Sequence, residues 1–391
     1  MSITIDQDQE FLDDVGRIAL GVASLHADAV DRDGRFPAEA IAALRDAGAL
    51  SAFVPTELGG GGVSLPALAR GCYELGRCCS SAAMVFAMHQ IQVATIVRHL
   101  DGAPWFEEYL RCLATDQRLI ASVTSELGTG GDMGRSIAAV TASSGGLLAL
   151  EKQAPTVSYG AYADDLFTTA RRSEHAEPGD QVLVLHARDQ TELEPTGTWD
   201  TLGMRGTCSP GFTVRAQFGP EQVLPAPFSA VMNESHVPIS HILWSHVWLG
   251  IATEAFERGR SFVRAAARRS AGQPVPAAHS LSRVMSELAM LRAEVRCALA
   301  DFVAASEDDD RERLATMGSV LRFNNLKLAA SEQTPRICVG VLEVIGIAAY
   351  KNDSPFGVGR QLRDALSARL MVANERIHSI DAGLLLISKE I

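Results

Sequence analysis

The chain has 391 residues, 47% of them hydrophobic and 21% charged, which excludes a disordered chain, a collagen-like fibre and a small disulfide-stapled fold. The 47 acidic residues outnumber the 35 lysines and arginines and give a formal net charge of −12, so we expect no nucleic acid and no membrane surface as a partner. The 7 cysteines lack the paired spacing of a metal or redox site. We therefore expect reduced thiols, no metal and a cytoplasmic location.

The first 117 residues have the apolar spacing of helices. Pro37 suits a first helical position, Ile41 and Leu44 recur at helical spacing, and Gly48 provides a stop. We predict an N-terminal helical domain over residues 1–117.

The pattern changes to short runs rich in β-branched residues between about residues 118 and 232. These runs are separated by Gly, Pro, Asp and Ser, and they cover 120–124, 166–170, 182–185 and 212–218. Helical spacing returns over 233–391, where one apolar stripe extends from Leu281 to Phe302. Because the elements are segregated, we predict a mostly α member of the α+β class, with a middle β domain and a C-terminal helical bundle.

Several segments resemble motifs of one family, in the family's order. They are Phe36-Pro37 with 54–60, Ser125 to Asp132, Trp199 to Thr207, and Arg363-Asp364-Ala365. On these motifs the whole chain resembles the acyl-CoA dehydrogenase superfamily, flavoproteins with an N-terminal helical domain, a middle β-barrel domain and a C-terminal four-helix bundle. The resemblance implies FAD as cofactor and a homodimer or homotetramer.

The resemblance also implies cofactor contacts in the β domain. Thr124 and Ser125 lie where the family contacts the edge of the flavin ring. Thr156 and Ser158 fall at the family's Trp-Ile-Thr segment, where Ser158 can supply the same hydroxyl but Thr156 cannot replace the stacking surface of an indole. Gly131 takes the place of a Ser that helps to bind the acyl-CoA moiety.

Further cofactor contacts are implied in the bundle. Arg268 matches an arginine that reaches the cofactor diphosphate of a neighbouring subunit, and a guanidinium suits that task. Gly346 is the surviving glycine of a motif that approaches the adenosine diphosphate, and the Cβ atoms that follow it remove room for that approach. Asn374 stands in the motif segment that follows the catalytic position and is expected to contact the cofactor.

The carboxylate base of the family is missing. Its usual position, eight residues after Asp364, holds Val372, and the alternative position on the first helix after the β domain holds Ser240; both are expected to contact substrate. Two substitutes are Glu375, one helical turn beyond Val372, and His241, which can titrate near neutral pH. His89 lies in a region where flavin monooxygenases of this fold often use a His, with a hydrogen-bonded core histidine as the alternative.

Three functions are compatible with these residues. The first is FAD-dependent α,β-dehydrogenation of an acyl thioester, carried on CoA or an acyl-carrier protein, with a non-standard base and an electron-transfer partner or oxygen as acceptor. The second is a flavin-dependent monooxygenase of the same fold, which the missing carboxylates favour because the oxygen chemistry belongs to the cofactor. The third is a degenerate, non-catalytic oligomeric scaffold subunit.

Overall fold

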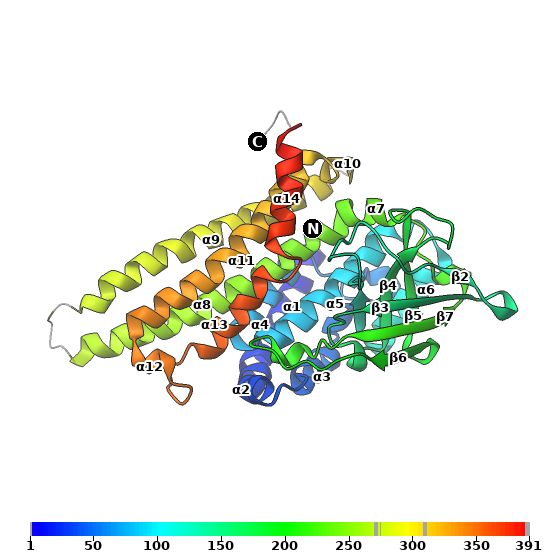
Figure 1. Ribbon diagram of the computed structural model, residues 1–391. Helices are drawn as coiled ribbons and strands as arrows, with labels where there is room; N and C mark the ends of the chain where they lie inside the picture. Colours follow the sequence, from blue (N-terminus) through cyan, green and yellow to red (C-terminus); the bar gives the residue numbers. More distant parts are fainter. Residues whose placement is uncertain (1, 270–272, 274, 308–310, 388–391) are drawn as a thin grey trace.

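The computed structural model describes residues 2–269, 273, 275–307 and 311–387, and it has the predicted order of helices, strands and helices (Figure 1). The N-terminal helices are α1 (Ser2–Ile18), α2 (Ser24–Asp33), α3 (Ala38–Asp46), α4 (Leu65–Cys78), α5 (Ser80–His99) and α6 (Pro104–Asp116). α4 begins as its sequence suggests, because the Ser64 hydroxyl accepts the backbone N–H of Ala67 and a proline occupies the first turn.

Helix α5 is the central helix of this region. By length and hydropathy it could cross a membrane, but 89% of its apolar window is buried inside the protein. It packs against α4, α8 and β1, so its apolar surface is covered by other parts of the same chain. A helix that is apolar on all sides is expected in such a core.

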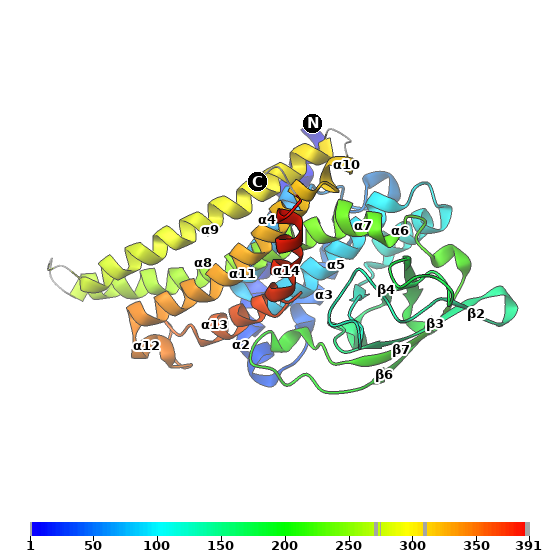
Figure 2. The same ribbon diagram turned by 45° about the horizontal axis from the view of Figure 1, so that its top comes forward.

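The middle strands form two sheets, which lie together on one side of the molecule (Figure 2). The two sheets share a hydrophobic core. One sheet has the order β1 (Ile120–Val123), β4 (Asp165–Arg171), β5 (Gln181–Ala187), with β1 parallel to β4. The other has the order β2 (Thr141–Ala142), β3 (Leu148–Ala154), β7 (Phe212–Phe218), β6 (Thr191–Pro195). Leu150, Val184 and Phe218 are buried between the two sheets.

The C-terminal helices form a bundle that extends away from the strands (Figures 1 and 2). They are α8 (Val237–Arg269), α9 (Pro276–Glu307), α10 (Arg311–Leu314), α11 (Met317–Ile345), α12 (Ile347–Tyr350), α13 (Gly359–Leu366) and α14 (Asn374–Leu385), and the short α7 (Phe228–Val231) precedes them beside β5. α8 packs against both α9 and α11. Leu288, Leu291 and Val295 of the predicted stripe are buried, and the predicted fold class is confirmed.

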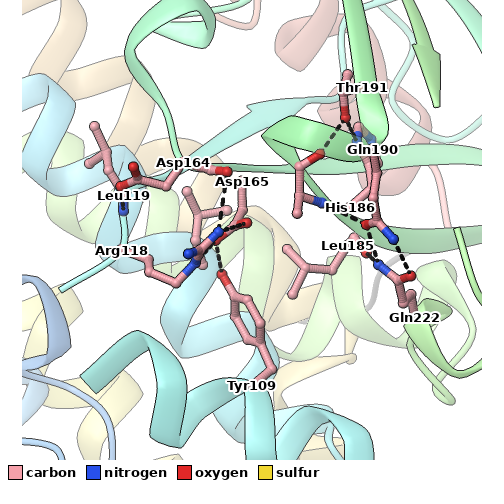
Figure 3. A network of polar contacts seen from close by, with 12 residues as sticks. Tyr109, Arg118, Leu119, Asp164, Asp165, Leu185, His186, Gln190, Thr191 and Gln222 are labelled. Atoms are coloured by element: carbon pink, nitrogen blue, oxygen red, sulfur yellow. Dashed lines mark hydrogen bonds and ion pairs between the residues drawn. The ribbon is translucent and has the colours of Figure 1, made fainter. Parts of the chain in front are cut away.

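A network of polar contacts joins the N-terminal helices to the first sheet (Figure 3). The Arg118 guanidinium donates to both carboxylate oxygens of Asp165, each at 2.7 Å, and the Tyr109 hydroxyl donates to Asp165 Oδ2 at 2.7 Å. Beside it, Asp164 accepts the backbone N–H of Leu119 at 2.8 Å. Bidentate charged hydrogen bonds are directional, so this network fixes the start of β1 and β4 relative to α6.

Candidate active site

A cavity of about 540 Å³ lies between the strands, α5 and the C-terminal helices. Its size is within the range of about 300–1,000 Å³ that is usual for small-molecule sites. We call its two sides the hydroxyl wall, made of Thr124, Ser125, Thr156, Ser158 and Ser209, and the helical wall, made of His236, Ser240, Trp244 and Val372. Methionines and other apolar side chains make up much of the remaining lining, among them Met84, Met88, Ile91, Met133, Leu202, Leu366, Leu370 and Met371.

The hydroxyl wall contains all four of the residues predicted to hold the flavin ring from the β domain. Ser125 Oγ donates to the Thr156 carbonyl at 2.6 Å, which joins the segment after β1 to the segment after β3. Ser209 Oγ donates to Ser158 Oγ at 3.0 Å and contacts Thr207 Oγ1 at 2.9 Å. Ser209 was missed from the sequence, because only the fold brings its loop beside Ser158.

The helical wall follows one face of the chain from the π-turn at Met232–His236 into α8. His236, Ser240 and Trp244 are four residues apart, so they lie above one another on a helix. The Ser240 hydroxyl and Trp244 Nε1 are buried and have no hydrogen-bond partner among the described residues. Buried donors without partners are costly, so these two positions on the helical wall are unusual.

His236 was not predicted as a site residue, although the spacing of four between it, Ser240 and Trp244 was visible in the sequence. Its side chain is buried and lines the cavity, and its Nδ1 lies 3.3 Å from the hydroxyl of Thr95 on α5. Burial lowers the pKa of His236 to about 4, with a smaller contribution from His99 in the same direction. The imidazole is therefore neutral at neutral pH.

No Asp or Glu side chain lies among the cavity-lining residues that the structure describes. Val372 and Ser240 do line the cavity, as the resemblance implied, and neither can act as a carboxylate base. The one cation on the described wall, Arg363, forms an ion pair with Asp31 and donates to the carbonyl of Leu202 at 2.9 Å. The described lining is therefore neutral apart from a paired arginine.

The two expected substitutes for the base lie outside the cavity wall. Glu375 is exposed on the first turn of α14 and does not line the cavity. His241 is buried on α8, but its Nδ1 is 2.9 Å from the carbonyl of Phe323, and burial lowers its pKa to about 3. The positions of both side chains give no support to the predicted catalytic roles.

Asn374 also lies behind the wall rather than on it. Its side-chain oxygen accepts a hydrogen bond from Lys327 Nζ, and its amide donates to Ser331 Oγ at 3.1 Å. Val372 and Ala373, which precede it, have positive φ angles of 57° and 39°, which side chains with a Cβ adopt at a cost. The buried Lys327–Asn374 bond thus anchors a strained turn that carries part of the helical wall.

Two of the resemblance motifs meet beside the cavity. Asp364 Oδ1 accepts the backbone N–H of Met204 at 2.7 Å, and burial raises the pKa of this carboxyl. A Cβ at Gly203 would lie 2.1 Å from the Arg363 carbonyl oxygen, so this glycine is required by backbone contact. The motif residues hold the 199–209 loop of the β region against α13.

Three more predicted site residues lie away from the cavity. Gly131 is in an exposed turn with φ of 82°. Arg268 is exposed at the end of α8 distant from the strands, and the Ser270 to Gly272 part of its motif lies outside the described residues. Gly346 has φ of 73° and ends α11. The expected contacts of Arg268 and Gly346 with a cofactor bound to a neighbouring subunit stay predictions.

His89 is a hydrogen-bonded core histidine. Its Nε2 is 2.7 Å from the Leu50 carbonyl, and its Nδ1 accepts the N–H of Ile120 at 3.0 Å. Both ring nitrogens are therefore occupied, and the residue does not line the cavity.

The comparisons with known proteins agree with this architecture. The family described as acyl-CoA dehydrogenase, N-terminal domain, matches residues 6–115. A probable acyl-CoA dehydrogenase, YngJ of Bacillus subtilis, is 23% identical over 348 residues, covering 87% of each chain. Residues 6–115 therefore match this family, and the predicted resemblance of the chain to the acyl-CoA dehydrogenase superfamily is confirmed.

Other proteins that resemble the chain are monooxygenases by name. A probable FMNH2-dependent monooxygenase, SfnC of Pseudomonas putida, is 26% identical over 345 residues, covering 82% of each chain. The structure of FMN-bound TdsC, a dibenzothiophene monooxygenase of Paenibacillus sp. A11-2, superimposes with a TM-score of 0.82 at 21% identity and covers 96% of this chain and 97% of that one. TdsC has also been solved with FMN and indole. The fold family therefore includes both flavin dehydrogenases and flavin monooxygenases.

The residues present fit a flavin. The hydroxyl wall offers several short donors and acceptors, and Ser240 and Trp244 also line the cavity. The apolar remainder of the lining suits a planar aromatic ring, which contributes mostly apolar surface.

Proposed function

We propose that the protein is a flavin-dependent monooxygenase that uses reduced FMN and dioxygen to oxygenate a small, largely apolar substrate. The observation that carries the proposal is the absence of a carboxylate from the described cavity lining. Dehydrogenation of an acyl thioester needs a general base at the α-carbon. Of the two positions that could hold this base, one carries Val372 and the other Ser240. A monooxygenase does not need that base.

When bound, reduced flavin supplies two electrons to dioxygen, so that one oxygen atom enters the substrate and the other leaves as water. The residues of the chain bind and orient the flavin and the substrate. Ser125 and Ser158 suit the polar edge of the ring, while Met84, Met88 and Trp244 surround the space beside it with apolar surface and exclude water.

FMN is preferred here over the FAD expected from the resemblance. The segment after Gly346 carries Ile347, Ala348 and Ala349, whose Cβ atoms leave less room for an adenosine diphosphate. Two of the relatives carry FMN in their names. We further propose a cytoplasmic homodimer or homotetramer, with Arg268 reaching the phosphate in a neighbouring subunit, and a separate reductase that supplies the reduced flavin.

The decisive experiment compares the two reactions on one preparation. We expect the purified protein to bind photoreduced FMN anaerobically, and its bound flavin to stay oxidised when acyl-CoA esters of several chain lengths are added without oxygen. With a reductase, isotopically labelled dioxygen and a panel of aromatic compounds, we expect labelled product by mass spectrometry. Anaerobic bleaching by an acyl-CoA would establish a dehydrogenase instead, and binding of neither FMN nor FAD would leave the scaffold function.

A further inference from the structure

His236 is the one ionisable side chain on the described cavity wall that has no oppositely charged partner, since Arg363 is paired with Asp31. It ends the π-turn at Met232–His236, an irregular helical turn of a kind often found at functional sites. The turn places its ring between α5 and the cavity, in edge contact with Phe228 at a centroid distance of 6.2 Å.

The hydrogen bond to Thr95 determines which ring nitrogen carries the proton. The Thr95 hydroxyl has a single proton, and it donates this proton to the Ile91 carbonyl at 2.8 Å. Thr95 Oγ1 can then only accept from His236, so Nδ1 carries the hydrogen across the 3.3 Å contact. In a neutral imidazole this leaves Nε2 as an acceptor with a free lone pair.

His236 lines the cavity, whereas Thr95, the partner of its Nδ1, does not. This is the arrangement expected when the Nδ1 edge faces the protein interior and the Nε2 edge faces the cavity. The ionisable groups that act on His236 are His99 on α5 and His241 on α8, both of them buried. Neither is a carboxylate that could hold His236 in its charged form.

The surroundings of His236 restrict what could bind there. Met88, Trp244 and Met371 contribute apolar surface to the same cavity, and burying a charged ligand without a partner is strongly unfavourable. A neutral aromatic molecule with a single donor would satisfy both the apolar surface and the acceptor.

We propose that His236 Nε2 is the hydrogen-bond acceptor that selects neutral aromatic substrates carrying one N–H or O–H group. The inference rests on the proposed function in one respect, namely that the selected molecule is then oxygenated. The selection itself is a property of binding and can be measured without the reaction. His236 is thus a specificity-determining residue of the cavity.

The test uses two probes of nearly equal shape. Indole has an N–H donor, and benzofuran has an oxygen in its place. We measure the dissociation constants of both by calorimetry at pH 7.5, with oxidised FMN present. For the wild type we expect indole to bind roughly tenfold more tightly, the scale of one hydrogen bond of about 1.4 kcal/mol.

Three variants locate the effect. His236→Leu removes the acceptor and should bring the two affinities within about a factor of two of each other. His236→Gln keeps an acceptor oxygen and should retain most of the preference. His246→Leu is the matched control, because His246 on α8 is likewise a buried histidine with a pKa lowered to about 4, but it contacts the Ile242 carbonyl and does not line the cavity. It should keep the wild-type ratio.

A second measurement covers the case in which His236→Leu does not fold. In nitrogen-labelled wild-type protein, indole should shift the Nε2 resonance of His236 and benzofuran should not. Equal binding of the two probes by the wild type, no binding of indole, or a full preference in His236→Leu would each overturn the assignment. An N–H preference without any oxygenated product would contradict the proposed monooxygenase and leave the role of His236 standing.

Discussion

The two walls of the cavity differ in how closely they follow the family pattern. The hydroxyl wall has its Ser and Thr side chains where the resemblance places contacts to a flavin, and all four residues predicted there line the cavity. The helical wall has lost the carboxylate at both family positions and presents His236, Ser240 and Trp244 in their place.

The difference indicates a division of tasks. A flavin ring needs similar donors and acceptors whichever reaction it performs, so the wall that holds it can stay unchanged. The group that faces the substrate must suit the reaction, so that wall must change with the chemistry. Resemblance in the first wall therefore predicts the cofactor class, and only the second wall separates a dehydrogenase from a monooxygenase.

The largest effect is expected where the 199–209 loop of the β region contacts the backbone of α13 beside the cavity. Gly203→Val would place a Cβ 2.1 Å from the Arg363 carbonyl oxygen, which cannot move without displacing α13. We expect a loss of about 3 kcal/mol or more in the free energy of unfolding, measured by urea denaturation. Gly197→Ala is the control, since nothing lies within 4 Å of its added Cβ, and it should leave the midpoint nearly unchanged. An equal effect of both changes would show that the contact between the 199–209 loop and α13 does not stabilise the protein.

A smaller effect is expected from Lys327, whose hydrogen bond to Asn374 supports the helical wall. Burial lowers the pKa of Lys327 from 10.5 to about 8, so between these values the unfolded chain binds a proton that the folded chain has released. Stability contributed by this group therefore rises with pH from about 8 toward 10.5. We expect Lys327→Met to reduce that rise by about 1 kcal/mol per pH unit, in denaturation curves between pH 8 and 9.5.

The exposed Lys351→Met serves as the control for this measurement, because its side chain is in contact with water in both states. Its pH dependence should match the wild type. A rise of full size in Lys327→Met would mean that another group causes it, for example the buried Lys152, whose pKa burial also lowers to about 8.

The smallest effect should separate cofactor binding from substrate selection. Ser158→Ala removes a hydroxyl from the hydroxyl wall and should weaken FMN binding roughly tenfold, as measured by fluorescence quenching. It should not change the preference for indole over benzofuran, because His236 is untouched. Ser144→Ala, on an exposed turn, should alter neither quantity. Loss of the N–H preference in Ser158→Ala would contradict the division between the walls.

Much of the fold could be predicted from the sequence because its signals are local. Pro37 and Gly48 bound a helix, and the stripe around Leu288 is buried as its spacing predicts. The hydroxyl wall was found through motif residues that lie close together along the chain. The sequence also showed that Val372 stands where the family has its carboxylate, because that position is found by counting eight residues from Asp364.

The sequence by itself thus determined the order of helices and strands, the cofactor class and the absence of a family base, because each depends on neighbouring residues. The tertiary structure alone decided which polar groups face the cavity. His236 acquires its neutral tautomer from Thr95, 141 positions away, and His241 and Glu375 are turned from the cavity by packing of α8 and α14. Burial and hydrogen bonds between distant segments set those orientations, and no local pattern encodes them.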